Sequence, residues 1–181
     1  HGDPSVYDPK TLVLPPHYVD TPATREAFQK YLAEVSFFDK QVGICLDLLD
    51  RHQLTDDTLL IVLSEQGNSF PFAKWTCYDA GLQSGMIVRW PGKVEAGSRT
   101  DAMVEYVDVV PTLLQAAELK KPRGVEGRSF LPVLGGSRDL HKQYSFGLQT
   151  SRGINNGPES YGIRSVRSER YRYILNLSPD V

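Results

Sequence analysis

The sequence predicts an α/β fold: part of a mixed sheet flanked by helices, followed by a small antiparallel β subdomain at the C-terminal end. Three observations indicate this. A helical pattern begins near residue 21, and an apolar run at residues 59–63 ends abruptly in polar residues. Strand-like alternation then replaces helical spacing near residue 140. We therefore predict one domain over residues 1–140 and the start of a second over residues 141–181.

Composition is that of a globular protein with a core of its own. The chain has 181 residues, 40% of them hydrophobic and 23% charged, and a net charge of −2. We expect no nucleic-acid partner, since the one basic stretch, residues 164–172, is typical of a strand with solvated arginines. No apolar run is long enough to span a membrane, so no membrane partner is expected.

The helical pattern has a clear start and one apolar face. Thr21 is predicted as the N-cap and Pro22 as the first helical residue. The helix is expected to end near residues 51–53. Apolar residues recur at three- and four-residue steps and predict a face that packs on a sheet, with Cys45 as a buried, inert thiol: Phe28, Tyr31, Leu32, Val35, Phe38, Val42, Cys45, Leu46 and Leu49.

Several shorter elements follow. Residues 59–63 have the pattern of a buried parallel strand, and residues 86–90 form a second apolar run. Residues 103–106 suggest another short strand, after which Asp108 is expected to cap a helix running through Leu119. Residues 144–149, 162–168 and 171–176 alternate like strands, and the last two are predicted to form a hairpin.

The end of the strand at residues 59–63 carries the chemistry. Glu65 and Gln66 offer carboxylate and carboxamide oxygens, which suit a hard divalent cation, and Lys74 is close enough in sequence to reach back toward them as an anion-binding charge. Composition alone favours a simpler interpretation, in which Glu65 and Gln66 bond to backbone in a tight loop and Lys74 is solvated. Two ligands are also too few for a complete site.

Seven segments, in order, resemble the type I sulfatases of the alkaline-phosphatase superfamily. Among them, residues 58–67 (TLLIVLSEQG) resemble a family strand that ends in Asp, Asn or His, and Gly. Residues 74–81 (KWTCYDAG) resemble the family segment that starts with a lysine. The remaining segments are residues 31–43, 89–92, 107–114, 127–135 and 163–173. The resemblance covers nearly the whole chain, and it identifies residues 1–140 as the C-terminal part of the catalytic α/β domain.

The resemblance implies roles for the strand-end residues. Glu65 and Gln66 stand where the family places an Asp and an Asn or His that bind Ca²⁺, and Lys74 stands where it places the lysine that grips the sulfate. Each of the first two side chains is one methylene longer than in the usual pair, although the donor types are kept. We expect the metal site to survive, either with a shifted backbone or with a slightly longer reach of these side chains.

The family's nucleophile, a formylglycine made from Cys or Ser in a C/S-x-P-S-R or C/S-x-A-x-R motif, has no match in this chain. We therefore expect the nucleophile upstream of His1, in a missing N-terminal half of the same enzyme, and no turnover by this chain alone. By resemblance, His1, Arg152 and Asn156 are candidate substrate-binding residues. A surface position for His1 and an Asn- and Gly-rich turn around Arg152 are the simpler alternatives.

The resemblance implies part of a sulfuric ester hydrolase that removes O- or N-sulfate from a sulfated carbohydrate such as a glycosaminoglycan. It also implies a periplasmic or secreted location. Two alternatives remain open: a phosphodiesterase or phosphonate hydrolase of the same superfamily, and a carbohydrate-binding relative that has lost the chemistry.

Overall fold

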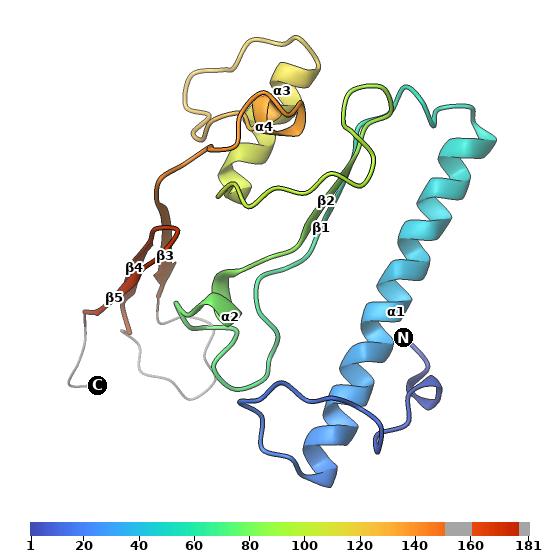
Figure 1. The fold of residues 1–181 in the computed structure, drawn as a ribbon, viewed down its shortest axis with the longest axis vertical. Coiled ribbons are helices and arrows are strands. Elements are labelled where there is room, and N and C mark those ends of the chain that lie inside the picture. Colours follow the sequence, from blue (N-terminus) through green and yellow to red (C-terminus); the bar gives the residue numbers. More distant parts are fainter. Residues whose placement is uncertain (151–160, 178–181) are drawn as a thin grey trace. The chain divides into compact units, whose positions relative to one another are not determined.

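The computed structural model describes residues 1–150 and 161–177, and the chain divides into two compact units, residues 1–58 and residues 59–181. The mixed α/β class predicted from the sequence is confirmed: a long helix forms most of the first unit. Short helices, a two-stranded sheet and a three-stranded antiparallel sheet form the second (Figure 1).

The first unit is built on α1, Pro22–Arg51. As predicted, Thr21 is the N-cap, and its Oγ1 accepts a hydrogen bond from the backbone N–H of Thr24 at 3.1 Å. The segment before the helix contains η1, Pro4–Val6, and is fastened to the helix by polar side chains. Gln29 donates to the carbonyls of Pro4 and Tyr7 at 2.8 and 2.6 Å. The helix therefore organises the N-terminal segment around itself.

The apolar stripe of α1 is not buried as predicted. Among the residues of α1 only Ala33 is buried, while Val35 is 46% exposed and Phe38 is 49% exposed. Cys45 is also exposed, so the expectation of a buried thiol is wrong for this residue. Helical spacing shows that one face is apolar, but it does not supply the surface that covers that face.

The second unit begins with two paired strands, β1 (Leu60–Leu63) and β2 (Met86–Arg89). They run antiparallel, with Leu63 opposite Met86, so the expectation of a parallel strand is wrong for this pairing. Both strands are mostly half-buried. A continuous apolar run marks a strand with little solvent on either face, but it does not specify the direction of the neighbouring strand.

Short helices follow, with α2 at Asp79–Leu82, η2 at Tyr106–Asp108, α3 at Val109–Ala116 and α4 at Leu131–Leu134. The strand expected at residues 103–106 is absent, and η2 begins at its end. Asp108 precedes α3 as predicted, but its side chain makes no capping bond to α3. The carboxylate lies instead in a buried cluster, where it accepts the backbone N–H groups of Glu105 and Arg128 at 3.0 and 2.8 Å.

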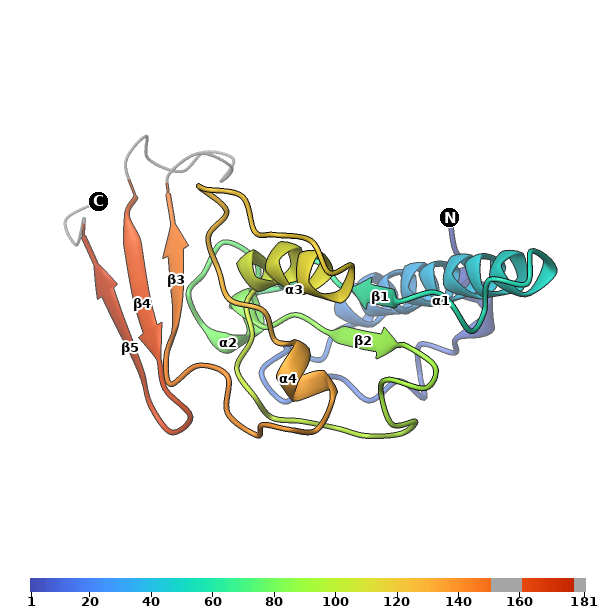
Figure 2. The ribbon, with the colours of Figure 1, turned by 90° about the horizontal axis from the view of Figure 1, so that it is seen from above.

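The antiparallel sheet at the C-terminal end is confirmed. Its strands are β3 (Ser145–Gln149), β4 (Ile163–Arg167) and β5 (Arg172–Asn176), in the order β3-β4-β5 (Figure 2). The predicted hairpin joins β4 to β5, and its turn is closed by the Ser168 N–H donating to the Tyr171 carbonyl at 2.8 Å. Gly147 of β3 lies against the Leu82 side chain of α2, so the sheet contacts the segment that follows β1.

Candidate active site

Ser64 fixes the end of β1. Its backbone N–H donates to the Gly85 carbonyl at 3.0 Å, and its Oγ accepts the Gly85 N–H at 2.6 Å. The Tyr106 hydroxyl donates to the Ser64 carbonyl. With all its polar groups bound, Ser64 holds the backbone from which Glu65 and Gln66 project, and both of these residues are exposed.

The loop after Glu65 returns the chain to the strand end. Gly67 has a φ of +57°, a conformation that costs a residue with a Cβ roughly 1 kcal/mol or more. A Cβ at this position would lie 2.8 Å from the Lys74 nitrogen, so the two backbones are in close contact. The Lys74 N–H donates to the Asn68 carbonyl at 2.9 Å and closes the loop.

This closure brings Lys74 to Glu65. The Lys74 Nζ lies 2.8 Å from Glu65 Oε1, with the lysine side chain 21% exposed and the glutamate side chain 71% exposed. The expectation that Lys74 reaches back toward the strand end is therefore confirmed as geometry. A fixed ammonium beside a solvent-facing carboxylate can bind an anion and a cation side by side.

Two non-glycine residues close to Lys74 have a strained backbone. Phe72 has a φ of +64° and Trp75 a φ of +67°, although neither is a glycine. Bulky residues rarely adopt this conformation, and it persists only where surrounding contacts enforce it. Strained residues of this kind gather at functional sites. They therefore support a functional role for residues 67–75, which we call the Lys74 loop.

The donor types at the strand end suit a hard divalent cation, but their number is too small. Ca²⁺ takes about six to eight oxygen ligands, and Glu65 and Gln66 supply only part of such a shell. Residues 1–150 and 161–177 contain no group of three or more His, Cys, Asp or Glu side chains that could hold a metal ion. The part of the chain that the structure describes thus fits a partial metal site.

The remaining predicted residues lie in the first unit or outside the described residues. His1 belongs to the first unit, where its Nδ1 lies 2.9 Å from Glu34 Oε1 and its side chain is 98% exposed. Arg152 and Asn156 lie outside the described residues. Substrate binding by these three side chains stays a prediction.

Two arginines that were expected in solvent are instead bound to residues 77–79, which follow Lys74 along the chain. Arg167 Nε donates to Asp79 Oδ1 at 3.1 Å, and Arg172 bonds to the same oxygen. Arg172 also donates to the Cys77 carbonyl at 2.6 Å, and its side chain is only 15% exposed. No local pattern in the sequence indicates these contacts, because about ninety residues separate the partners.

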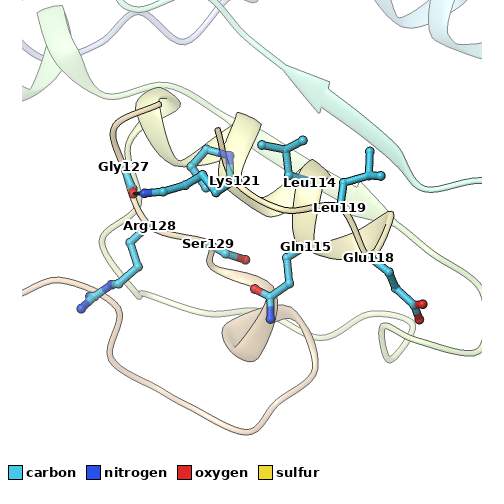
Figure 3. A pocket seen from close by; sticks show the side chains of 9 residues that line it. Leu114, Gln115, Glu118, Leu119, Lys121, Gly127, Arg128 and Ser129 are labelled. Atoms are coloured by element: carbon cyan, nitrogen blue, oxygen red, sulfur yellow. Dashed lines mark hydrogen bonds between the residues drawn. The ribbon is translucent and has the colours of Figure 1, made fainter. Parts of the chain in front are cut away.

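A pocket elsewhere in the second unit lies between α3 and residues 121–129 (Figure 3). Leu114, Gln115 and Glu118 form one side of it, and Lys121 donates to the Gly127 carbonyl at 3.1 Å on the other. Its lining contains none of the predicted site residues. The hollow and the charged strand end are therefore separate features.

These features define an α/β protein with a charged site at a strand end and an antiparallel sheet behind it. The chain belongs to the sulfatase family: residues 7–119 match the sulfatase family, and residues 67–178 match the C-terminal family of N-sulphoglucosamine sulphohydrolase. The superfamily resemblance seen in the sequence is thereby confirmed.

Individual relatives agree. An ulvan-active sulfatase of Formosa agariphila is 34% identical over 148 residues, which are 82% of this chain and 29% of that protein. Human N-sulphoglucosamine sulphohydrolase is 28% identical over 97% of this chain and 36% of its own length. The solved structure of BT4656 with D-glucosamine-2-N,6-O-disulfate shares the fold, with a TM-score of 0.76 at 22% identity over 90% of this chain and 35% of that one. The chain thus spans about a third of the length of these relatives.

Proposed function

We propose that the end of β1 and the Lys74 loop form one wall of the active site of a sulfatase that removes O- or N-sulfate from a sulfated carbohydrate. The observation that carries the proposal is the convergence of the Lys74 ammonium and the Glu65 carboxylate at 2.8 Å. Family membership supports the reaction class. Relatives named for N-sulphoglucosamine, and a neighbour solved with a disulfated glucosamine, support the substrate class.

Lys74 supplies charge where the reaction needs it. Cleaving a sulfate ester or sulfamate places growing negative charge on the sulfuryl oxygens and on the leaving atom. A pre-placed ammonium stabilises that charge without reorganising during the reaction. The ion pair with Glu65 holds the lysine side chain over the strand end before substrate arrives.

Glu65 and Gln66 are proposed as two ligands of a divalent cation, Ca²⁺ by resemblance. When bound, such an ion polarises the sulfate oxygens. The rest of its ligands and the formylglycine nucleophile would come from a further part of the same enzyme, because the 181 residues contain no formylglycine motif. Within residues 1–150 and 161–177, no helix is long and apolar enough to cross a membrane. A periplasmic or secreted location stays part of the proposal.

The experiment is Lys74→Ala in the full-length protein, with sulfate release from a sulfated glucosamine as the readout. We expect a roughly 100- to 1,000-fold loss of turnover, which is typical when one pre-placed donor to a developing charge is removed. Lys93→Ala, at an exposed turn residue, is the matched control and should be neutral. Unchanged turnover by the Lys74 variant would contradict the proposal. A wild-type protein that binds the sugar without releasing sulfate would contradict it as well.

A further inference from the structure

The segment that carries Lys74 is held by the C-terminal hairpin. Arg167 at the end of β4 and Arg172 at the start of β5 face each other as a cross-strand pair. Like charges opposite each other on a sheet destabilise it. Asp79 lies between them, and its Oδ1 accepts from both guanidinium groups, at 3.1 Å from Arg167 Nε. The aspartate therefore offsets the repulsion within the hairpin and ties it to α2.

Arg172 also grips the backbone of the same segment. Its Nη1 donates to the Cys77 carbonyl at 2.6 Å, while another guanidinium nitrogen bonds to Asp79. The two acceptors match the planar fork of an arginine, and a lysine could not reproduce this geometry. Cys77 is 1% exposed and the Arg172 side chain is 15% exposed, so this contact is partly shielded from solvent.

Tight packing connects these contacts to Lys74. Gly81 lies against the carbonyls of Ala73 and Thr76, where no side chain would fit. Thr76 Oγ1 donates to the Ala73 carbonyl at 2.7 Å. In Figures 1 and 2, α2 lies beside β3, in agreement with the contact between Leu82 and Gly147. Residues 73–82 therefore form one compact turn that contains Lys74 together with Cys77 and Asp79.

We propose that Arg172, together with Arg167 and Asp79, is a positioning residue for the Lys74 ammonium. We call these three residues the arginine clamp. The clamp makes the C-terminal sheet part of the catalytic machinery, since the sheet holds the turn that delivers Lys74 to Glu65. The inference rests on the function proposed for Lys74.

The test uses Arg172→Lys and Asp79→Asn in the full-length protein, with kcat, KM, thermal stability and amide hydrogen exchange as readouts. Arg172→Lys keeps the charge and removes the fork. We expect kcat to fall about 10- to 100-fold, as for a displacement of roughly 1 Å at a reacting group, with a smaller change in KM. Amide exchange should accelerate in residues 73–82 but not in α3. Arg170→Lys, in the exposed turn of the hairpin, is the matched control.

A double variant separates positioning from general stability. If Arg172 acts through Lys74, adding Arg172→Lys to Lys74→Ala should cause no further loss of kcat. Wild-type kcat and wild-type exchange rates in Arg172→Lys would overturn the positioning role of the clamp but not the proposed function. The same holds if Arg172→Lys lowers the kcat of Lys74→Ala by the same factor as it lowers the kcat of the wild type. Exchange accelerating equally in α3 would overturn it too, since it would indicate a general loss of stability. Full activity of Lys74→Ala would overturn the proposed function and, with it, the role of the clamp.

Discussion

Lys74 reaches Glu65 through backbone contacts that the sequence shows only in part. Polar residues after an apolar run predicted a functional strand end, and a glycine such as Gly67 permits an unusual backbone angle or a close approach. The structure shows both at Gly67, with its positive φ and its contact with the Lys74 backbone. The arginine clamp was not predictable, because its bonds join residues that are far apart along the chain. A basic strand looks the same in sequence whether its arginines are solvated or paired.

At the same scale, Gly67→Ala tests the loop closure. The new Cβ would meet the Lys74 nitrogen at 2.8 Å and would also occupy a positive φ. We expect a loss of unfolding free energy larger than the roughly 1 kcal/mol that the backbone angle alone costs, together with reduced turnover. Gly92→Ala is the control, since Gly92 has a φ of +70° and no atom lies within 4 Å of the position that the new methyl group would occupy. Equal losses in unfolding free energy would show that the contact with Lys74 is unimportant.

At the scale of elements, the sequence predicted the start of the long helix and the C-terminal hairpin, but not which neighbours the elements pack against. Thr21 and Pro22 start α1 as predicted, and the β4–β5 hairpin has the expected turn. The direction of the strand paired with β1 and the exposure of the α1 stripe differ from expectation, because each depends on a neighbour that periodicity does not identify. Asp108 shows the same limit. A good capping residue in sequence, it serves in the structure as a buried acceptor for groups as distant along the chain as Lys142.

The Asp108 cluster joins η2 to the start of the C-terminal sheet. Lys142 Nζ lies 2.7 Å from Asp108 Oδ2 and 2.5 Å from Glu105 Oε2, and Glu105 accepts the Phe146 N–H at 3.2 Å. Burial would raise the pKa of Asp108, but hydrogen bonds from Lys142 and from two backbone N–H groups outweigh it and lower that pKa. His141 Nε2 lies 3.2 Å from the same carboxylate, which can only accept, so the nitrogen donates.

Stability should depend on pH through His141. Burial lowers the pKa of this imidazole more than the Asp108 charge raises it, so the folded state favours the neutral ring. As pH falls below about 6.5, the unfolded chain takes up a proton that the folded chain resists. The stability that the folded state gains from a neutral His141 is therefore present above that pH. It is lost as pH falls toward the lower pKa that His141 has in the folded state.

The measurement is the unfolding free energy of the full-length protein at several pH values between about 7.5 and 5. We expect the wild type to lose more stability over this range than His141→Gln, whose side chain does not titrate. His52→Gln, at an exposed histidine, should keep the wild-type slope. Identical slopes for the wild type and His141→Gln would contradict the assignment.

At the scale of the whole molecule, the chain contributes one wall of the proposed site. It matches sulfatases along most of its length but spans about a third of theirs. The fold and the family are therefore clear, while Glu65 and Gln66 supply only part of the proposed metal shell. The charged strand end, the Lys74 loop and the arginine clamp are all contained in the second unit. The second unit therefore contains both the proposed Lys74 site and the residues proposed to position it.

The most direct test is a crystal structure of the full-length protein, made inactive at its nucleophile and bound to a sulfated glucosamine. We predict a sulfate oxygen about 3 Å from Lys74 Nζ. We also predict a divalent ion with Glu65 and Gln66 oxygens about 2.3–2.6 Å away. A sulfate group bound at another site, with Lys74 still paired to Glu65, would contradict the central claim.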